Sequence, residues 1–210
     1  MNGSARTPPD LRRCRDLGRE QGLAAGLAAA LAGLDPLREA PAGVAVLPAA
    51  ALPGGVGVLP HPVAGLEGLV LVRIPSNGSL PAHPRGLAGA RASALAAVRI
   101  GVLDRLLDLA VERLQNRRFA GVALIDQQLV AGAVADVAVE IELATAGMGL
   151  DATPEVAWAG HERLTEAGWS VARFFGAEGF TTDHPARSLH MSALVADMWV
   201  ARPTAVAGKE

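Results

Sequence analysis

The run RASALAAVRIGVLDRLLDLAVERLQN, residues 91–116, is typical of one long amphipathic helix. Apolar residues recur in it at steps of four and three and therefore line one face: Leu103, Leu107, Ala110 and Leu114. The acidic residues fall largely on the other faces: Asp104, Asp108 and Glu112. The spacing predicts a helix of about 25 residues that buries one side against neighbouring elements.

Three further helical patterns follow towards the C-terminus. The first has an apolar seam at alternating steps of four and three: Val130, Val134, Val137, Ile141, Ala144 and Met148. Thr153 and Pro154 supply a cap and a first-turn proline for the next helix, which residues 176–179 interrupt. A last helix is expected from near Asp183 to about Val200. Because the loops are short, we predict a mainly α protein built on an antiparallel four-helix bundle.

The N-terminal part of the chain follows a different pattern. Asp10 can cap a helix in which leucines recur at helical steps: Leu23, Leu27, Leu31 and Leu34. Short valine and leucine runs, separated by Pro and Gly, then predict short strands paired antiparallel: 44–47, 56–59 and 69–74. We therefore expect an N-terminal helix with a small antiparallel β segment over 1–86, the bundle over 87–202 and a tail over 203–210.

Composition narrows the classes of partner. The 19 basic and 21 acidic residues nearly cancel, so neither nucleic acid nor an anionic membrane is an expected partner. The apolar stretch at 22–34 is too short to span a bilayer, and a single cysteine, Cys14, fits a reducing compartment. We expect a cytoplasmic globular protein, and the Ala- and Arg-rich, tyrosine-free composition suggests a GC-rich bacterial genome.

Three local motifs fall in order along the predicted bundle. They are an alanine pair at 96–97 with Gly101 and the turn RRFAG at 117–121, then Gln128 with the pair at 135–136, and finally FGAEGFTTDHP at 175–185. At these separations they resemble the C-terminal helical domain of the acyl-CoA dehydrogenases.

The resemblance implies a flavoprotein with FAD as cofactor that dehydrogenates an acyl thioester, carried by coenzyme A or a carrier protein, between its α and β carbons. It implies a general-base role for Asp183. Arg117 and Gln128 look like the residues that reach the diphosphate and adenine side of FAD, commonly one bound by a neighbouring subunit. Gly176, Ala177 and Gly179 are similar to the small residues whose backbone approaches the cofactor.

Each of these residues also has a purely structural interpretation. Asp183 before His-Pro suits a helix N-cap, and Arg117 with Arg118 suits a helix C-terminus. A glutamine on a helix, such as Gln128, is more often only solvated, and the glycine turn can end a helix without binding anything. The surround of Phe180, Pro185 and Leu189 would raise the pKa of a buried Asp183, although aspartate reaches less far than glutamate.

The remaining chemistry-bearing residues form no recognisable site. No spacing of His, Cys and acidic residues suggests a metal centre, so we expect none. His161 lies near the start of its predicted helix, where we expect it to be solvated. The tryptophans are expected to be core or interface anchors: Trp158, Trp169 and Trp199.

The sequence departs from the family pattern in ways that leave three hypotheses open. The region before residue 91 is much shorter than the family's, and the glutamate-glycine-threonine expected after the last helix is absent near Trp199. The first hypothesis is a flavoenzyme with Asp183 as base. The second is a non-catalytic or half-site subunit. The third is a flavin-free scaffold or enzyme. A homo-oligomer or a heteromer with a longer acyl-CoA dehydrogenase-like subunit is expected, because the resembling cofactor edge is used across subunits.

Overall fold

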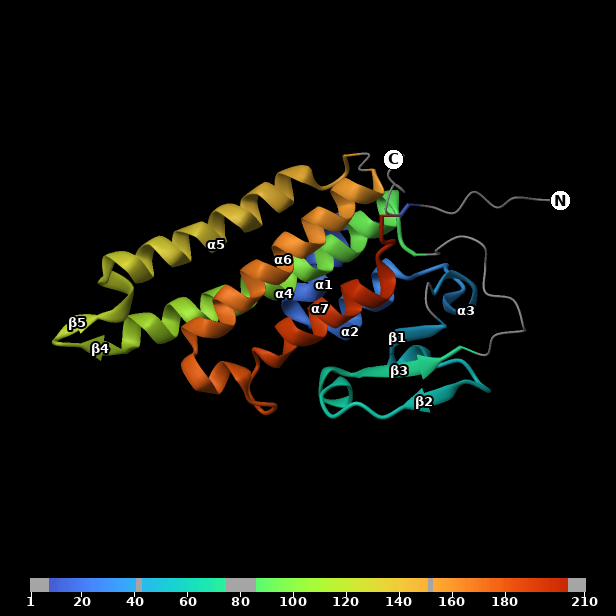
Figure 1. Ribbon diagram of the computed structural model, residues 1–210, viewed down its shortest axis with the longest axis horizontal. Coiled ribbons are helices and arrows are strands. Elements are labelled where there is room, and N and C mark those ends of the chain that lie inside the picture. The colour runs from blue at the N-terminus through green and yellow to red at the C-terminus, as the bar shows by residue number, and fades with distance from the viewer. Residues whose placement is uncertain (1–7, 41–42, 75–85, 151–152, 204–210) are drawn as a thin grey trace, which may run out of the picture.

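The computed structural model describes residues 8–40, 43–74, 86–150 and 153–203. Four helices form the expected antiparallel bundle: α4 (Gly89–Asn116), α5 (Gln128–Gly147), α6 (Pro154–Phe174) and α7 (Arg187–Trp199). Figure 1 shows them lying side by side along the long axis of the molecule. The mainly α prediction is therefore confirmed. Within the described ranges, no helix is both long enough and apolar enough to cross a membrane.

Helix α4 is the centre of the bundle, whereas α5 lies at its margin. The four apolar residues predicted to line one face of α4 are buried. On α5 the predicted seam is buried only at Val137 and Ile141, while Val139 and Leu143 are 54% and 52% exposed. This difference arises because α5 packs against α4 and α6 on one side and has no described element on the other.

The N-terminal pattern gives two helices and not the single one expected. Helix α1 (Leu11–Glu20) starts at Asp10, whose carboxylate accepts from the Arg13 amide as predicted. Gly22 then adopts a φ of 88°, which turns the chain into α2 (Leu23–Ala30). A short helix, α3 (Pro36–Glu39), follows. The leucine stripe therefore belongs to α2 and the turn after it.

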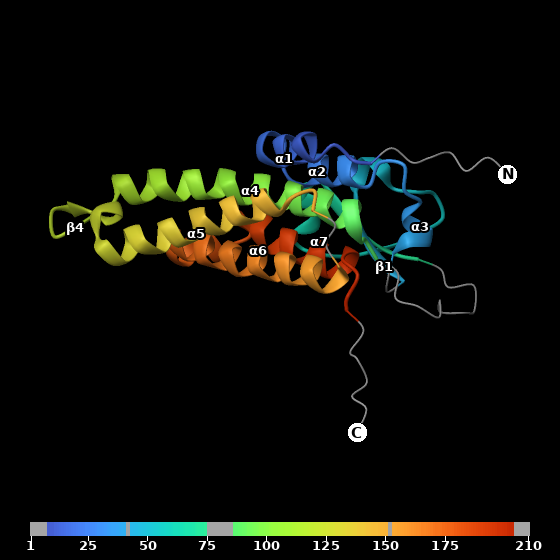
Figure 2. The same ribbon diagram turned by 90° about the horizontal axis from the view of Figure 1, so that it is seen from above.

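Helices α1 and α4 cross in unusually close contact, which glycines permit. A Cβ atom at Gly101 of α4 would lie 2.1 Å from the Arg15 carbonyl oxygen, and one at Gly18 of α1 would lie 2.4 Å from the Val98 carbonyl oxygen. Beside the crossing, Asp104 forms ion pairs with Arg15 at 3.2 Å and with Arg19 at 2.6 Å. In Figure 2, α1 and α2 lie along one side of α4, away from α6 and α7.

The predicted strands form a small antiparallel sheet with the order β1-β3-β2. Its strands are β1 (Val44–Pro48), β2 (Gly57–Leu59) and β3 (Leu69–Arg73), and the 3-10 turn η2 (Ala64–Glu67) precedes β3. The buried Trp199 indole donates a 2.7 Å hydrogen bond to the Val46 carbonyl oxygen and so attaches the end of α7 to β1.

A second hairpin, which the sequence did not suggest, closes the far end of the bundle. Strands β4 (Arg118–Phe119) and β5 (Val122–Ala123) flank a turn in which Ala120 and Gly121 have φ values of 49° and 84°. A 3-10 turn, η3 (Leu124–Asp126), then leads into α5. Figures 1 and 2 place this hairpin at the end of the bundle opposite the three-stranded sheet.

Candidate functional site

Arg117 and Gln128 bracket the far hairpin. Arg117 ends α4, and its carbonyl oxygen accepts from the Leu124 amide at 2.8 Å, which closes the hairpin. Gln128 is the first residue of α5, and both side chains are exposed. No hydrogen bond or ion pair joins the Arg117 guanidinium to another described residue. We call Arg117, Gln128 and the residues between them the hairpin edge.

The glycine turn between α6 and α7 is explained by packing. Gly176 has a φ of 67° and ends α6, as a left-handed glycine commonly does. The turn continues as η4 (Gly176–Phe180), in which Gly176 and Ala177 are exposed. A Cβ atom at Gly179 would lie 2.3 Å from the Ala172 carbonyl oxygen, so Gly179 lets η4 fold back onto α6. The backbone at Gly176 and Ala177 remains open to a ligand, whereas the backbone at Gly179 is covered by α6.

Asp183 lies in the loop after η4 and is exposed. A hydrogen bond from Thr181 is the main cause that lowers the pKa of its carboxyl group, and the nearby His184 and Arg187 act in the same direction. The expected capping role is wrong: α7 begins at Arg187, and the His184 imidazole Nδ1 accepts from the Ala186 amide at 3.1 Å. In the single chain, Asp183 therefore lacks the dry surround that would raise its pKa.

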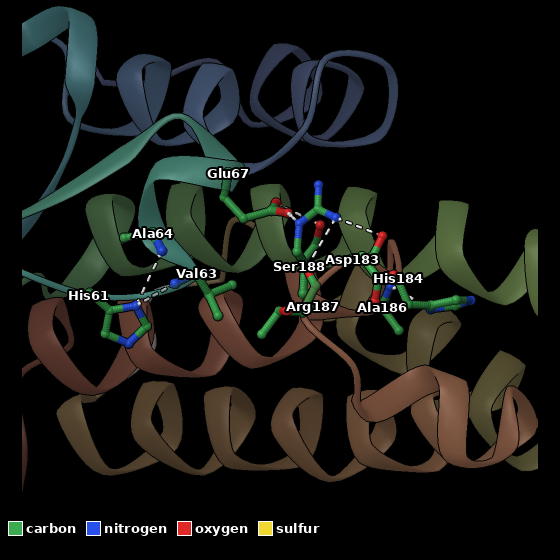
Figure 3. A network of polar contacts seen from close by, with 10 residues as sticks. His61, Val63, Ala64, Glu67, Asp183, His184, Ala186, Arg187 and Ser188 are labelled. Atoms are coloured by element: carbon green, nitrogen blue, oxygen red, sulfur yellow. Dashed lines mark hydrogen bonds and ion pairs between the residues drawn. The ribbon is translucent and has the colours of Figure 1, made fainter.

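A buried carboxylate from the sheet region holds the loop in place. Glu67, at the end of η2, forms a 2.7 Å ion pair with Arg187 and accepts a 2.6 Å hydrogen bond from the Ser188 hydroxyl. The Arg187 guanidinium also donates to the Asp183 carbonyl oxygen at 3.2 Å. Figure 3 shows the Glu67 carboxylate lying against Arg187 and Ser188, with Asp183 on the far side of the guanidinium. The small sheet segment thus fixes the backbone of the candidate acid.

A cavity of about 270 Å³ adjoins this loop, and we call it the turn cavity. Its lining comes from α6, η4, α7, the loop between η4 and α7, and the residue before η2: Val63, Trp169, Gly179, Phe180, Thr181, Thr182, Ala186, Arg187 and His190. The rings of Trp169 and Phe180 are nearly parallel, with an angle of 6° and centroids 6.5 Å apart. Sequence reasoning did not find this cavity, because its aromatic residues come from separate elements.

A second polar group lies inside the bundle and was also missed. Arg99 of α4 is 2% exposed, and its guanidinium donates to the Ser192 hydroxyl at 3.0 Å and to the Thr165 hydroxyl at 2.7 Å. His161 is 2% exposed, so the expectation that it is solvated is wrong. Its Nδ1 accepts from Arg99 at 3.0 Å, and its Nε2 donates to the Ala92 carbonyl oxygen at 3.2 Å. We call these four side chains the core polar cluster.

The core polar cluster consists of one buried cation and neutral partners. Burial lowers the pKa of His161 to about 3, and the positive charge of Arg99 adds to the effect. Burial also lowers the pKa of Arg99 to about 10. An arginine on the buried face of α4, between Val98 and Ile100, was the one signal in the sequence that such a cluster exists.

An apolar cavity of about 320 Å³, with His161 in its lining, opens between α4, α5 and α6. Small and aliphatic side chains form most of its lining, including Ala92, Ala96, Leu143 and Met148. Within the described residues, no group of three or more His, Cys, Asp or Glu side chains is placed to hold a metal ion.

Comparisons with known proteins identify the family to which this chain belongs. The family model for the acyl-CoA dehydrogenase C-terminal domain matches residues 84–200, which is more than half of the chain. The chain belongs to the acyl-CoA dehydrogenase family. A comparison with curated proteins gave no match.

The fold of this acyl-CoA dehydrogenase-family chain is similar to that of a solved butyryl-CoA dehydrogenase. The butyryl-CoA dehydrogenase of Megasphaera elsdenii is 15% identical, with a TM-score of 0.50, over 77% of this chain and 46% of that chain. The ChsE4-ChsE5 complex of Mycobacterium tuberculosis matches with 21% identity and a TM-score of 0.46, over 69% of this chain and 44% of that chain. The chain thus spans less than half the length of the structures that it matches.

Members of the acyl-CoA dehydrogenase family are FAD-dependent flavoproteins, and the donors of this chain fit only part of that cofactor. At the hairpin edge, the exposed Arg117 guanidinium and the Gln128 amide suit a diphosphate and its neighbouring groups. The glycine turn offers open backbone at Gly176 and Ala177. The last helix ends at Trp199 and the next residue, Val200, is buried in a bridge to Leu87, so no carboxylate stands there.

Proposed function

We propose that this chain is a bundle subunit of an acyl-CoA dehydrogenase-type flavoenzyme, which removes hydrogen from the α and β carbons of an acyl thioester. The thioester is carried by coenzyme A or by a carrier protein. The hairpin edge contributes Arg117 and Gln128 to an FAD that a second chain also contacts. That chain is a longer acyl-CoA dehydrogenase-like subunit or another copy. The observation that carries the proposal is the exposed Arg117 guanidinium, which no other described residue engages, in a chain of this family.

The chemistry divides between the cofactor and the protein. FAD, when bound, accepts the hydride that leaves the β carbon. At the hairpin edge the Arg117 guanidinium presents several donors in one plane, which matches the oxygens of a diphosphate. The amide of Gln128 donates and accepts next to it. These side chains bind and orient the cofactor and take no proton from the substrate.

The α-proton has to be taken by a carboxylate whose pKa is raised in a dry site. Asp183 is this chain's candidate for that base, but its pKa is lowered while the loop is exposed. A second chain that covered the loop would exclude water and raise that pKa. The base is therefore either Asp183 under a partner's cover or a carboxylate of the partner itself.

The first experiment is the visible absorption spectrum of the chain purified alone, then with added FAD, then together with a longer acyl-CoA dehydrogenase-type chain from the same genome. We expect no stoichiometric flavin in the chain alone and a flavin band in the complex. Arg117→Ala should lower the flavin content of the complex at least tenfold, since it removes a charge-assisted contact to phosphate. Arg105→Ala, an exposed arginine earlier on α4, is the matched control.

Stoichiometric FAD in the chain purified alone would contradict the subunit proposal and support a stand-alone flavoenzyme. The Asp183→Asn variant then separates the two origins of the base in whichever species is active. If Asp183 is the base, Asp183→Asn removes activity while flavin content stays the same. If the partner supplies it, turnover and its pH profile are unchanged.

A flavin-free reaction on a thioester is the second candidate, and the apolar cavity lined in part by His161 favours it. At about 320 Å³, this cavity has the size of a small ligand site and a mostly apolar lining. Failure of both the chain and its complexes to bind FAD, together with saturable binding of a short-chain acyl thioester, would support this candidate over the first.

A further inference from the structure

The turn cavity has a flat aromatic wall that the proposed function does not use. Trp169 of α6 is 37% exposed and Phe180 of η4 is 60% exposed, although large aromatic side chains gain most when they are covered. Their rings are parallel to within 6°, and the 6.5 Å centroid distance lies towards the outer end of the range of about 4.5–7 Å for aromatic pairs. Each ring therefore keeps apolar surface that its neighbour does not cover.

The imidazole of His190, which also lines the cavity, extends this wall on the α7 side. The His190 ring lies 6.0 Å from the Trp169 ring at an angle of 50°, and the His61 ring lies 6.4 Å from His190 at 22°. The polar residues of the lining include Thr181, Thr182 and Arg187. The cavity thus combines flat apolar faces with hydrogen-bonding groups, the combination that planar rings containing nitrogen require.

Size limits what the cavity can hold. Its volume of about 270 Å³ lies just below the range of about 300–1,000 Å³ of sites that enclose a whole drug-sized ligand. One ring system fits, whereas a complete dinucleotide does not. The hairpin edge lies across the far hairpin and contributes no residue to this lining. The two places are therefore separate candidates for binding.

We propose that the turn cavity binds a planar heteroaromatic group of one or two fused rings, stacked against Trp169 and Phe180. The ring faces supply the affinity, because aromatic stacking tolerates any flat ring. The threonine hydroxyls and Arg187 select rings with hydrogen-bonding atoms. Binding here also covers the loop that carries Asp183, since Thr181 and Thr182 line the cavity directly before it.

The indole N–H signals in nitrogen-15 NMR spectra of the full chain provide the test. Adenosine and indole are titrated as planar probes, and cyclohexanol as a saturated one. We expect the Trp169 signal to shift with both planar probes and not with cyclohexanol. Trp199 is the internal reference, because its buried N–H is bonded to Val46.

Variants then locate the site. The binding of each probe to each variant is measured by saturation-transfer NMR. Trp169→Ala should weaken adenosine binding about tenfold or more, the usual loss when a stacking partner is removed. Phe180→Leu, which keeps an apolar side chain without a flat ring, should also weaken it. Trp158→Ala is the matched control, since Trp158 lies near the start of α6 with Arg202 over its ring, and binding should be unchanged.

Three results would overturn the proposal. They are an unmoved Trp169 signal up to the solubility limit of adenosine, an equal shift with cyclohexanol, or equal losses in Trp158→Ala and Trp169→Ala. The outcome is independent of flavin binding at the hairpin edge, since Arg117→Ala leaves every residue of the turn cavity in place.

Discussion

His161 makes the stability of this protein depend on pH. Its neutral imidazole accepts from Arg99 and donates to Ala92 in the core, and its pKa falls from 6.5 to about 3 on folding. In the unfolded chain the His161 imidazole binds a proton as the pH falls below 6.5, whereas in the folded chain it binds one only near pH 3. The stabilisation is complete above pH 6.5 and is lost as the pH falls towards 3.

We therefore expect the free energy of unfolding to drop by about 3 kcal/mol between pH 7 and pH 4.5 because of this one group. Urea titrations at both values measure the drop. His161→Gln, which can still accept from Arg99 but does not titrate, should be less stable at pH 7 and show a shallower pH dependence. An unchanged pH dependence in that variant would assign the effect to other groups. Arg99 stays charged in both states over this range, since its pKa is about 10.

Ala120 is a strained residue whose replacement should stabilise the protein. It has a φ of 49° in the hairpin turn, in the left-handed region that alanine disfavours. Asparagine followed by glycine is the preferred pair for such a turn. Ala120→Asn should raise the free energy of unfolding by about 0.5–1 kcal/mol, and Ala120→Val should lower it. Thermal melts of both variants check the sign, and equal effects would exclude strain as the cause.

The crossing of α1 and α4 gives a sharper prediction about an element. Gly101→Ala would place a methyl group 2.1 Å from the Arg15 carbonyl oxygen, and backbone atoms cannot give way as a flexible side chain can. We expect a loss of about 1–3 kcal/mol or more in the free energy of unfolding.

The control for this prediction is another helical glycine. A Cβ atom at Gly132 of α5 meets nothing within 4 Å, so Gly132→Ala should be neutral or stabilise by up to about 1 kcal/mol. Denaturant unfolding of the two variants separates close packing from helix propensity. If both destabilise equally, α1 does not pack on α4 as described.

The helices and strands could be predicted from the sequence because their signals are local. The spacing of apolar residues in 91–116 and the short valine runs repeat within one element. The break at Gly22 was missed, because a glycine within an alanine-rich stripe interrupts no apolar periodicity. The start of α7 was placed too early, since His184 supplies the hydrogen bond expected from Asp183.

The candidate site was predicted less completely, because its contacts join distant parts of the chain. Arg99 is 62 residues from His161 and 93 from Ser192, and Glu67 is 121 residues from Ser188. The sequence pattern of a single helix or strand does not indicate which distant residues will form hydrogen bonds with one another. The hairpin edge and the glycine turn were found through family motifs, whereas the turn cavity also needs Val63, Trp169 and His190, which lie outside those motifs.

At the scale of the whole molecule, the exposed apolar residues of α5 predict association. Val139 and Leu143 lie one turn apart and are 54% and 52% exposed, and Leu129 at the start of the helix is 89% exposed. Exposed apolar rows of this kind mark contact surfaces. Val139→Gln with Leu143→Gln should weaken self-association or partner binding at least tenfold, measured by sedimentation velocity, since two apolar contacts are lost.

Val58→Gln is the matched control, because Val58 is 53% exposed on β2 at the other end of the molecule. A wild-type chain that stays monomeric at high concentration and in mixtures with a longer family member would contradict the prediction. So would equal effects of the α5 and β2 substitutions.

The glycine crossing also sets the order in which this chain is expected to fold. Arg15 and Asp104 meet across 89 residues, whereas α5 and α6 meet across one short loop. Bringing Arg15 and Asp104 together closes the longer stretch of chain and costs more entropy. We therefore expect α1 to dock after α4, α5 and α6 have packed together. In amide hydrogen exchange, α1 should then open as a separate unit while α4 stays protected, and α1 should be the first of the described helices that a protease cleaves.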